Sequence, residues 1–592
     1  MMKKPKWIAV TSLTALGIGV ALAFGVPGSA SLNDPLYPWM GNGGYDAQHY
    51  TIDLRVPSDF KTIKGVSVMT AIASDDLSSF NLDLGSLDVQ FVLVDGVRAA
   101  FTHEDPELTV TPATPISKGS KFRVQVAYQG TPGSKAQADS FGGGWKVTPS
   151  GASFLAEPTS LKDIAAVNDS PVDKASFSFR LTAPQSQQAI ANGIFLSRRE
   201  NSDGTATSFY KISEPTTTYM PVLAFGPFKL VEGGKVDGVR IRHYLLPNTS
   251  PSYTPALAKT ADMIRFFNER LGKYPFREYG IITHDFVEGF ALENQTLSSF
   301  PLKFEGFDNA PPEVLQGVLE MVLAHELAHQ WFAGSVSFSD NSQIFIHEGF
   351  AEFLGRLWSE HSTGDKLEDS IRNDYPGMVY AKDGGYFQFP KAQLIGFLKT
   401  GLSINPTKKF SVVQVGQALD LIFSGTLPAA TRSAILERAT AAGGLTIAEI
   451  ADQIAPLPFT NIAVTRRTNR ELRRLADPSL PMVRPSPAPG KVVAGDDPFD
   501  QIGVYNRGAA TVYALKLKVG DATFFSILRT FLERHQYSTA SNEDFLKVVA
   551  ELGGADARAL TERWLFDDRV PDLPELGLKA DSSYPLGADF KP

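Results

Sequence analysis

Hydrophobic and polar residues alternate along the first part of the chain, from about residue 45 to residue 229. The alternation is clearest in four segments, whose apolar positions are Tyr50/Ile52/Leu54/Val56, Leu87/Val89/Phe91/Leu93, Phe122/Val124/Val126/Tyr128 and Phe177/Phe179/Leu181. A period of two, with turn signals such as Asp95-Gly96 between runs, predicts antiparallel strands that each bury one face. We therefore expect an N-terminal β domain, built as a saddle or sandwich of antiparallel sheets.

After Tyr244 the spacing of apolar residues becomes helical. The predicted helices cover residues 256–271, 313–332 and 348–358, and helical patterns dominate again from Ala509 to the C-terminus. The fold class is therefore multidomain α+β, with the antiparallel β part first and a mainly α-helical part after it.

One stretch, residues 385–488, belongs to neither pattern. It holds short helical patterns at 429–442 and 446–455, then an arginine cluster at 466–474, then closely spaced prolines. We interpret it as a helical insertion with a solvated basic face and a stiff proline-rich exit. The expected division is 1–30, signal peptide; 31–232, β domain; 233–384 and 489–592, the two parts of the helical domain; and 385–488, insertion.

The first thirty residues have the features of an export signal. Lys3, Lys4 and Lys6 precede an apolar run over residues 8–26, and Gly28-Ser29-Ala30 supplies small residues for cleavage after Ala30. An uncleaved segment would approach the ~20 residues that span a bilayer, so membrane attachment is expected only if cleavage fails. We expect the folded part to be secreted, periplasmic or associated with the cell surface.

Composition excludes several classes of site and partner. The formal net charge is −8 and no long basic run is present, so nucleic acid is not an expected partner. The chain has no cysteine, which excludes disulfides, thiolate zinc ligands, a cysteine nucleophile and a lipoprotein anchor.

The segment His325-Glu326-Leu327-Ala328-His329 carries the strongest chemical signal. Residues four apart lie on one face of a helix, so both imidazoles can reach one metal ion. Glu348 follows at a distance that lets a second, antiparallel helix return a carboxylate to the same ion. Its neighbour His347 points about 100° away on such a helix and is not expected to be a ligand.

Two imidazoles and one carboxylate are typical of catalytic zinc, because they leave a fourth position open for water. Zinc lowers the pKa of that water towards ~7. Glu326 lies beside His325 but is turned off the metal. We expect it to act as the general base that takes the water proton and passes it to the leaving amine.

In the zinc motif and in several other segments, the chain resembles the M1 zinc aminopeptidases of the gluzincin class, in a secreted bacterial-type two-domain form. The zinc motif extends to Gln330-Trp331-Phe332 and continues at Glu348-Gly349-Phe350-Ala351. Ala291-Leu292-Glu293-Asn294-Gln295-Thr296 resembles the family's Gly-x-Met-Glu-Asn exopeptidase motif. Further resemblances lie at Glu157-Pro158, at residues 168–175 and at residues 505–509.

The resemblance implies an N-terminal β saddle, a thermolysin-like catalytic domain and cleavage of the N-terminal peptide bond of peptides. Glu293, assisted by Glu157, would bind the free α-amino group, which is mostly protonated at neutral pH because its pKa is near ~8. Ala291 and Asn294 of the motif would also contact substrate. Peptides with a free N-terminus are the expected partners.

Tyr505 would support the developing oxyanion opposite the zinc ion, since a tyrosine pKa near ~10 keeps the hydroxyl protonated. Tyr380 and Tyr386 compete for this role and lie nearer Glu348 in the sequence. The context of Tyr505, with Arg507-Gly508-Ala509 opening a helix, favours it if the insertion accounts for the long gap.

Phe290 occupies the position of the family's glycine, and Ala333-Gly334 replaces the usual Gly-acid pair. Only a short segment follows Trp564, so we do not expect the C-terminal helical domains of larger relatives in this chain.

Three alternatives remain: a secreted thermolysin-like endopeptidase, a catalytically inactive zinc-binding surface protein, and a relative of the bifunctional leukotriene-hydrolysing branch. An endopeptidase would lack the Glu293 motif, and an inactive protein should lack Glu326 or the tyrosine.

Overall fold

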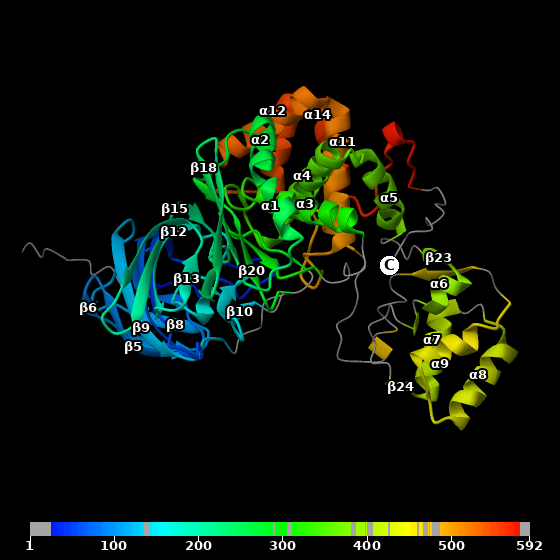
Figure 1. Ribbon diagram of the computed structural model, residues 1–592, viewed down its shortest axis with the longest axis horizontal. Coiled ribbons are helices and arrows are strands. Elements are labelled where there is room, and N and C mark those ends of the chain that lie inside the picture. Colours follow the sequence, from blue (N-terminus) through cyan, green and yellow to red (C-terminus); the bar gives the residue numbers. More distant parts are fainter. Residues whose placement is uncertain are drawn as a thin grey trace, which may run out of the picture.

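The structure is a computed structural model (Figure 1). It describes residues 25–134, 143–287, 290–304, 311–380, 386–396, 398–399, 407–423, 427–458, 461–465, 472, 474–475 and 486–580. Most of the predicted export signal, and the arginine cluster except Arg474, lie outside these residues. Residues 25–30 are described, and Val26–Pro27 form the short strand β1.

The N-terminal part is built on an eight-stranded sheet with the order β14-β15-β12-β2-β3-β9-β5-β6. Its pairs are antiparallel except β12 with β2. In that order the strands span Ile194–Glu200, Thr205–Thr216, Ala175–Pro184, Tyr45–Arg55, Ile63–Ala73, Lys121–Gly130, Asp88–Val94 and Val97–Arg98.

Two four-stranded sheets accompany it. The first has the order β1-β4-β8-β7, with β4 at Leu77–Asp83, β8 at Glu107–Thr111 and β7 at Ala100–Glu104. The second has the order β10-β11-β16-β13, at Gly144–Thr148, Gly151–Leu155, Leu223–Gly226 and Gln188–Ala191. Buried residues from all three sheets form one apolar core. The predicted order of a β-rich part before a helical part is confirmed.

The predicted alternation fails in one strand, β5. We expected Leu87, Val89, Phe91 and Leu93 to share its buried face, but Phe91 and Leu93 are half-buried and Val92 and Val94 are buried instead. The register of β5 against β9 shifts between Val89 and Phe91. Such a bulge inserts one residue and exchanges the two faces of the strand beyond it.

A fourth sheet, of five strands, leads into the helical part. It runs β17-β18-β20-β21, at Lys229–Val236, Val239–Leu245, Ile281–His284 and Ser298–Pro301, with β19 at Glu278–Tyr279 beside β18. The boundary expected at residue 232 falls inside β17, which pairs along its length with β18. The helix expected over residues 256–271 is two helices, α1 at Tyr253–Ala258 and α2 at Thr260–Leu271.

Two long helices, α3 at Pro312–Ala328 and α4 at Phe345–Thr363, lie at the centre of the helical part. Around them are α5 at Leu367–Tyr380, α11 at Arg507–Val519, α12 at Asp521–Arg534, α13 at Asn542–Gly553 and α14 at Ala555–Phe566. These helices and the five-stranded sheet share a second, large apolar core. Strands β22 (Ser337–Phe338) and β27 (Thr539–Ala540) pair across this region.

Glycines allow α4 to pack closely against both neighbours. A Cβ added at Gly355 would lie 3.1 Å from the Met321 carbonyl oxygen and 3.2 Å from the His325 Cβ of α3. A Cβ added at Gly508 of α11 would lie 2.8 Å from the Cα of Gly349. Real Cβ atoms essentially never come as close as the contact at Gly508, and few come as close as the contacts at Gly355, so a larger residue at either crossing would require the helices to shift.

The predicted insertion contains a separate lobe, drawn apart from the two main parts in Figure 1. It holds β23 (Tyr386–Pro390), α6 (Lys391–Gly396), β24 (Lys409–Phe410), α7 (Val412–Phe423), α8 (Ala429–Ala441), β25 (Leu445–Thr446), α9 (Ile447–Ile454) and β26 (Asn461–Thr465). Thr446 and Glu449 form a capping box at the start of α9. All residues of the lobe's apolar core lie between 394 and 475.

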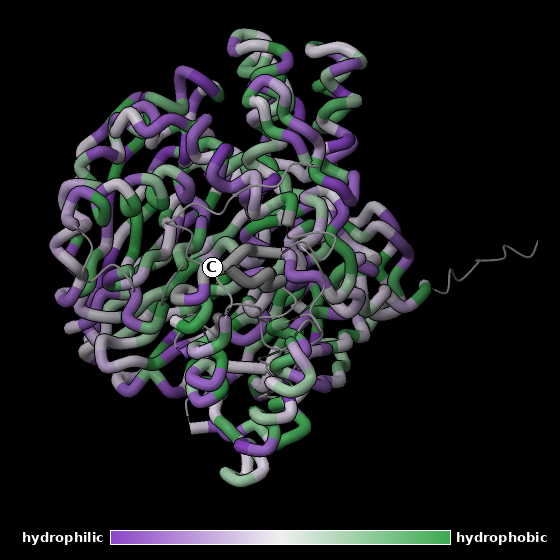
Figure 2. Tube along the Cα trace, turned by 90° about the vertical axis from the view of Figure 1, so that its right-hand side faces the viewer, coloured by the Kyte–Doolittle hydropathy of each residue, from purple (hydrophilic) through white to green (hydrophobic). Residues whose placement is uncertain are grey.

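Figure 2 shows hydrophobic and hydrophilic residues alternating at short intervals along the described trace. In that part of the chain, none of the helices combines the length and the apolar character needed to cross a membrane.

We predict that the lobe unfolds independently of the rest of the chain. Leu419 is fully buried in the lobe core, so Leu419→Ala should cost the lobe about 2–5 kcal/mol of unfolding free energy. Calorimetry of the full chain should then show one transition moved to lower temperature and the other unchanged. Leu354→Ala, in the large helical core, is the matched control and should move only the other transition. A single transition that shifts in both variants would contradict independent folding.

Candidate active site

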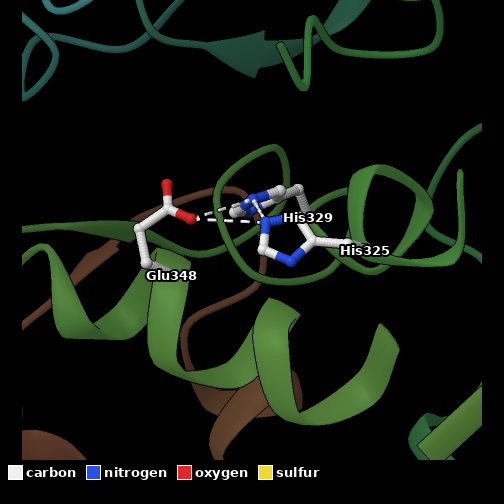
Figure 3. A group of neighbouring side chains, drawn as sticks. All are labelled: His325, His329 and Glu348. Carbon is white, nitrogen blue, oxygen red and sulfur yellow. Dashed lines mark hydrogen bonds and ion pairs between the residues drawn. The ribbon is translucent and has the colours of Figure 1, made fainter. Parts of the chain in front are cut away.

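Three side chains from α3 and α4 converge on one point (Figure 3). His325 lies in the last turn of α3, His329 directly follows that helix, and Glu348 lies in the first turn of α4. The Nε2 atoms of the two histidines are 3.1 Å apart, and Glu348 Oε2 lies 3.4 Å from the first and 3.5 Å from the second. These three residues form a group that could hold a metal ion.

Hydrogen bonds on the far sides of both rings decide which nitrogen faces the centre. His325 Nδ1 is 3.1 Å from Glu352 Oε2, and His329 Nδ1 is 3.0 Å from the Phe332 carbonyl oxygen. Both partners are acceptors, so each Nδ1 carries the hydrogen and each Nε2 offers a lone pair. Ligands at zinc distances of ~2.0–2.1 Å around a tetrahedron are separated by about 3.3 Å, so this trio fits a zinc ion.

Glu326 lies beside the trio without being part of it. It is buried, and within the described residues its Oε2 has no hydrogen-bond partner. Burial raises the pKa of Glu326 to about 7, against the opposing effect of the two histidines. One ligand atom each from Glu326, Glu293 and His329 also lie within 4.8 Å of one another. Glu326 therefore has the position and the proton affinity of a base beside the metal centre.

Glu293 is held against the zinc helix by its backbone. Gln330, which follows His329, donates from Nε2 to the Glu293 carbonyl oxygen at 3.1 Å and accepts from the Thr296 amide at 2.7 Å. The neighbouring Leu292 pairs in antiparallel fashion with Ser299 of β21. These contacts bring the Glu293 carboxylate to the metal centre, and burial raises the pKa of this carboxyl.

The other residues expected to bind substrate are placed differently. Asn294 is fully buried, its Nδ2 donates to the Met220 carbonyl oxygen, and its Oδ1 accepts from Ser299. Its amide therefore holds the loop together. Ala291 is half-buried against the helical core. Phe290 packs in an apolar cluster with Leu155 and Leu292. In the sequence, Leu155 is two residues before Glu157 and Leu292 is one residue before Glu293.

Glu157 is buried, and its charge acts on the same groups as that of Glu293. Both carboxylates contribute to raising the pKa of Tyr219 and of Tyr505, after the larger effect of burial. The structure therefore brings Glu157 to this site from the N-terminal part of the chain, although the sequence offered only a lone Glu-Pro pair.

Tyr505 lies in a π-helical turn, Gln501–Asn506, immediately before α11. Its ring is nearly parallel to that of His325, with 6.1 Å between centroids and 13° between planes. Burial, followed by the negative charge of Glu348, raises the pKa of Tyr505 well above 10, so the hydroxyl stays protonated. The Asp500 carboxylate caps this turn by accepting from the Ile502 and Gly503 amides. The side chains of Tyr380 and Tyr386 lie outside the described residues.

Glu352 and Arg356 form a pair behind the metal centre that was not predicted from the sequence. Despite burial, the Arg356 guanidinium and His325 lower the pKa of Glu352 to about 2. Arg356 also donates to Asp374 at 2.6 Å and to Asn506, the neighbour of Tyr505, at 2.9 Å. Glu352 is one helical turn after Glu348, so the i, i+4 spacing was the available signal.

His347 is not part of the metal group, as expected from its place beside Glu348. Its ring stacks on Phe338, and its Nε2 accepts a hydrogen bond from the Phe338 amide at 3.2 Å. Its other nitrogen faces Tyr219, a residue that the sequence analysis did not single out.

Comparison with known families identifies both main parts of the chain. Residues 255–383 and 448–564 match the peptidase family M1 domain, and residues 46–220 match the peptidase M1 N-terminal domain. Together the matches cover more than half of the chain. The unmatched residues, 384–447, overlap the first part of the predicted insertion, and residues 448–488 of that insertion lie within the match.

Individual relatives are distant. Endoplasmic reticulum aminopeptidase 1 of Mus musculus is 22% identical over 52% of this chain and 34% of its own length. Aminopeptidase 2, mitochondrial, of Saccharomyces cerevisiae is 25% identical over 56% of this chain and 38% of its own. The aligned part thus spans about a third of these relatives.

Among solved structures, an M1 zinc metallopeptidase from Deinococcus radiodurans matches in fold. The TM-score is 0.67 at 24% identity, over 92% of this chain and 99% of that one. A match at this identity concerns the fold alone.

We predict that Glu352 supports metal binding without touching the metal. Glu352→Ala removes the acceptor that orients His325 and should weaken zinc affinity about 10- to 100-fold. Competition with a chromophoric chelator measures this affinity. Glu320→Gln is the matched control, because Glu320 is a buried carboxylate of α3 that bonds to Gln316 and Ser362 instead. Unchanged zinc affinity in Glu352→Ala would contradict the role.

Proposed function

We propose that this chain, which belongs to peptidase family M1, is a zinc-dependent aminopeptidase that removes N-terminal residues from peptides. The observation that carries the proposal is the position of Glu293. Its carboxylate lies within 4.8 Å of ligand atoms of both Glu326 and His329, so a cation-binding group adjoins the metal centre. A free α-ammonium group held there would bring the first peptide bond to the metal.

Amine recognition rests on Glu293 with Glu157. Both carboxylates are buried, and a buried carboxylate binds an ammonium group strongly because water competes little with the pair. A peptide that continued past this point would bury its chain against two carboxylates without neutralising them. The site should therefore accept chain ends and reject internal segments.

The other residues of the site have separate roles in metal binding, proton transfer and stabilisation of the oxyanion. Zinc held by His325, His329 and Glu348 supplies Lewis-acid polarisation and a more acidic water. Glu326 takes a proton from the attacking water and delivers it to the leaving amine. The Tyr505 hydroxyl donates a hydrogen bond to the carbonyl oxygen as that oxygen gains negative charge. The raised pKa of Tyr505 supports a neutral donor in this role.

The names and bound ligands of similar proteins support the proposed aminopeptidase function. Curated relatives of both the animal and the yeast lines are named aminopeptidases. Among matching structures, an M1 zinc metallopeptidase variant from Deinococcus radiodurans is bound to a Tyr-Ser-Ala substrate, and a two-domain M1 zinc metallopeptidase variant is bound to L-tryptophan or L-arginine. An endopeptidase of the thermolysin kind is disfavoured by the match to the M1 N-terminal domain, which contains Glu157.

We predict that hydrolysis needs a free N-terminus. Wild-type enzyme should hydrolyse an aminoacyl p-nitroanilide but not its N-acetylated copy, because acetylation removes the cation that Glu293 binds. Glu293→Ala should reduce kcat/KM for the free-amine substrate by about 10- to 100-fold, as expected for loss of a charge-assisted hydrogen bond. Steady-state kinetics on the two substrates measures both effects.

Glu278→Gln is the control for removal of a buried carboxylate, since Glu278 pairs with Arg242 away from the metal group. It should leave the preference for a free amine intact. Equal rates on acetylated and free substrates in the wild type would mean that the enzyme is an endopeptidase.

We also predict that Glu326→Gln and Tyr505→Phe each keep the metal and lose turnover. Neither residue belongs to the trio, so zinc content should stay at one ion per chain. Loss of the base should lower kcat by about 10²- to 10⁴-fold, and loss of the hydroxyl donor by about 10²- to 10³-fold. Metal analysis and steady-state kinetics on the same preparations separate binding from catalysis.

Tyr513→Phe, in the adjoining α11, is the control for removing a tyrosine hydroxyl and should stay active. Normal turnover by Glu326→Gln would overturn the assignment of the base. If Tyr505→Phe is active while Tyr380→Phe or Tyr386→Phe is inactive, the oxyanion role belongs to the other tyrosine.

A further inference from the structure

A chain of hydrogen bonds connects the backbone of β22 with the carboxylate of Glu293. The Phe338 amide donates to His347 Nε2 at 3.2 Å, and His347 Nδ1 lies 3.4 Å from the hydroxyl oxygen of Tyr219. The Tyr219 hydroxyl in turn donates to Glu293 Oε1 at 2.8 Å. Tyr219 and His347 are both fully shielded from solvent, so water does not compete for these bonds.

Each bond in this chain can run in only one direction. A backbone amide is always a donor, so His347 Nε2 must accept, and the hydrogen of the neutral ring is then on Nδ1. His347 Nδ1 therefore donates to the Tyr219 oxygen. A tyrosine hydroxyl has one hydrogen, and with its oxygen already accepting from His347, that hydrogen is directed at Glu293.

The loop that carries Tyr219 is tied to the Glu293 motif a second time. The Met220 carbonyl oxygen accepts from Asn294 at 3.1 Å and from Asn192 at 3.0 Å. Tyr219 and Met220 pack together with Ala333, which follows the zinc motif. The hydroxyl of Tyr219 is thus fixed by backbone contacts as well as by its ring, and it can hold one oxygen of Glu293 in a constant position.

We propose that Tyr219 and His347 are positioning residues for amine recognition, which hold Glu293 Oε1 so that the rest of the carboxylate faces the substrate ammonium group. This inference rests on the proposed aminopeptidase function. It gives the histidine beside the metal ligand Glu348 a role on the substrate side of the site. It also predicts that breaking this chain of hydrogen bonds, called the relay below, slows the hydrolysis of free-amine substrates. The hydrolysis of analogues without the amine should be unchanged.

The test uses Tyr219→Phe, which keeps the ring and removes only the hydroxyl. With an aminoacyl p-nitroanilide, KM should rise about tenfold, as expected for one hydrogen bond to a charged group, with a smaller change in kcat. With the des-amino acyl p-nitroanilide, the slow rate should not change. Tyr253→Phe is the matched control, because the Tyr253 hydroxyl is equally buried and donates to the Pro301 carbonyl oxygen at 2.7 Å, outside the site.

Variants of His347 test the direction of the relay. Asparagine can replace the Nδ1 donor, whereas glutamine can replace only the more distant Nε2 acceptor. His347→Asn should therefore keep most of the preference for a free amine, and His347→Gln should lose as much of it as Tyr219→Phe does. When Tyr219→Phe is already present, His347→Gln should reduce the preference for a free amine little further, because the effects of substitutions in one hydrogen-bond network are not additive.

The outcomes separate this inference from the function on which it rests. If the wild type does not distinguish the free-amine substrate from its des-amino analogue, the aminopeptidase proposal itself fails. If the wild type distinguishes them and Glu293→Ala does not, while Tyr219→Phe behaves as wild type, the positioning role alone is overturned. Equal losses on both substrates in Tyr219→Phe, with zinc content retained, would also overturn it in favour of a general structural role.

Discussion

Close packing of α4 between α3 and α11 is the constraint on which the whole site depends. At Gly355 the backbone of α4 comes within contact distance of His325, and at Gly349 it meets Gly508 of α11. The first crossing brings Glu348 to the two histidines, and the second brings the turn that holds Tyr505. Neither crossing has room for a side chain without a shift of the helices, so the residues of the metal group and Tyr505 are positioned by close backbone contacts in a packed core.

Several carboxylates lie close together in the site, and their pKa values shift in different directions. Burial raises the pKa of Glu326 and of Glu293, whereas the two histidines lower that of Glu348 in spite of burial. Nearby carboxylates whose proton affinities diverge are suited to different roles, one as a ligand and another as a base. A metal ion and a substrate ammonium group are the two cations that would relieve this concentration of charge.

Arg356 lies behind the metal group and connects two parts of the site. It pairs with Glu352 behind His325 and donates to Asn506 beside Tyr505, so one guanidinium connects the partner of His325 with the turn that carries Tyr505. On the opposite side, Gln330 connects the zinc motif with the Glu293 loop. The lobe within the predicted insertion contributes no residue to either of these two connections, and its apolar core consists of its own residues, between 394 and 475. Its length therefore separates Glu348 from Tyr505 in sequence without separating them in space.

The sequence by itself determined the family, the order of the two main parts and the metal trio, because these depend on local periodicity and on spacing along one or two helices. His325 and His329 could be paired from the i, i+4 rule, and the strands around Tyr50 or Phe177 from simple alternation. The bulge in β5, which exchanges the faces of Phe91 and Val92, could not be read from alternation, because a bulge is set by the partner strand. Tertiary structure alone decided the relation of Tyr219 and His347 to Glu293, since these three residues come from separate segments and their hydrogen-bond directions follow from the fold around them.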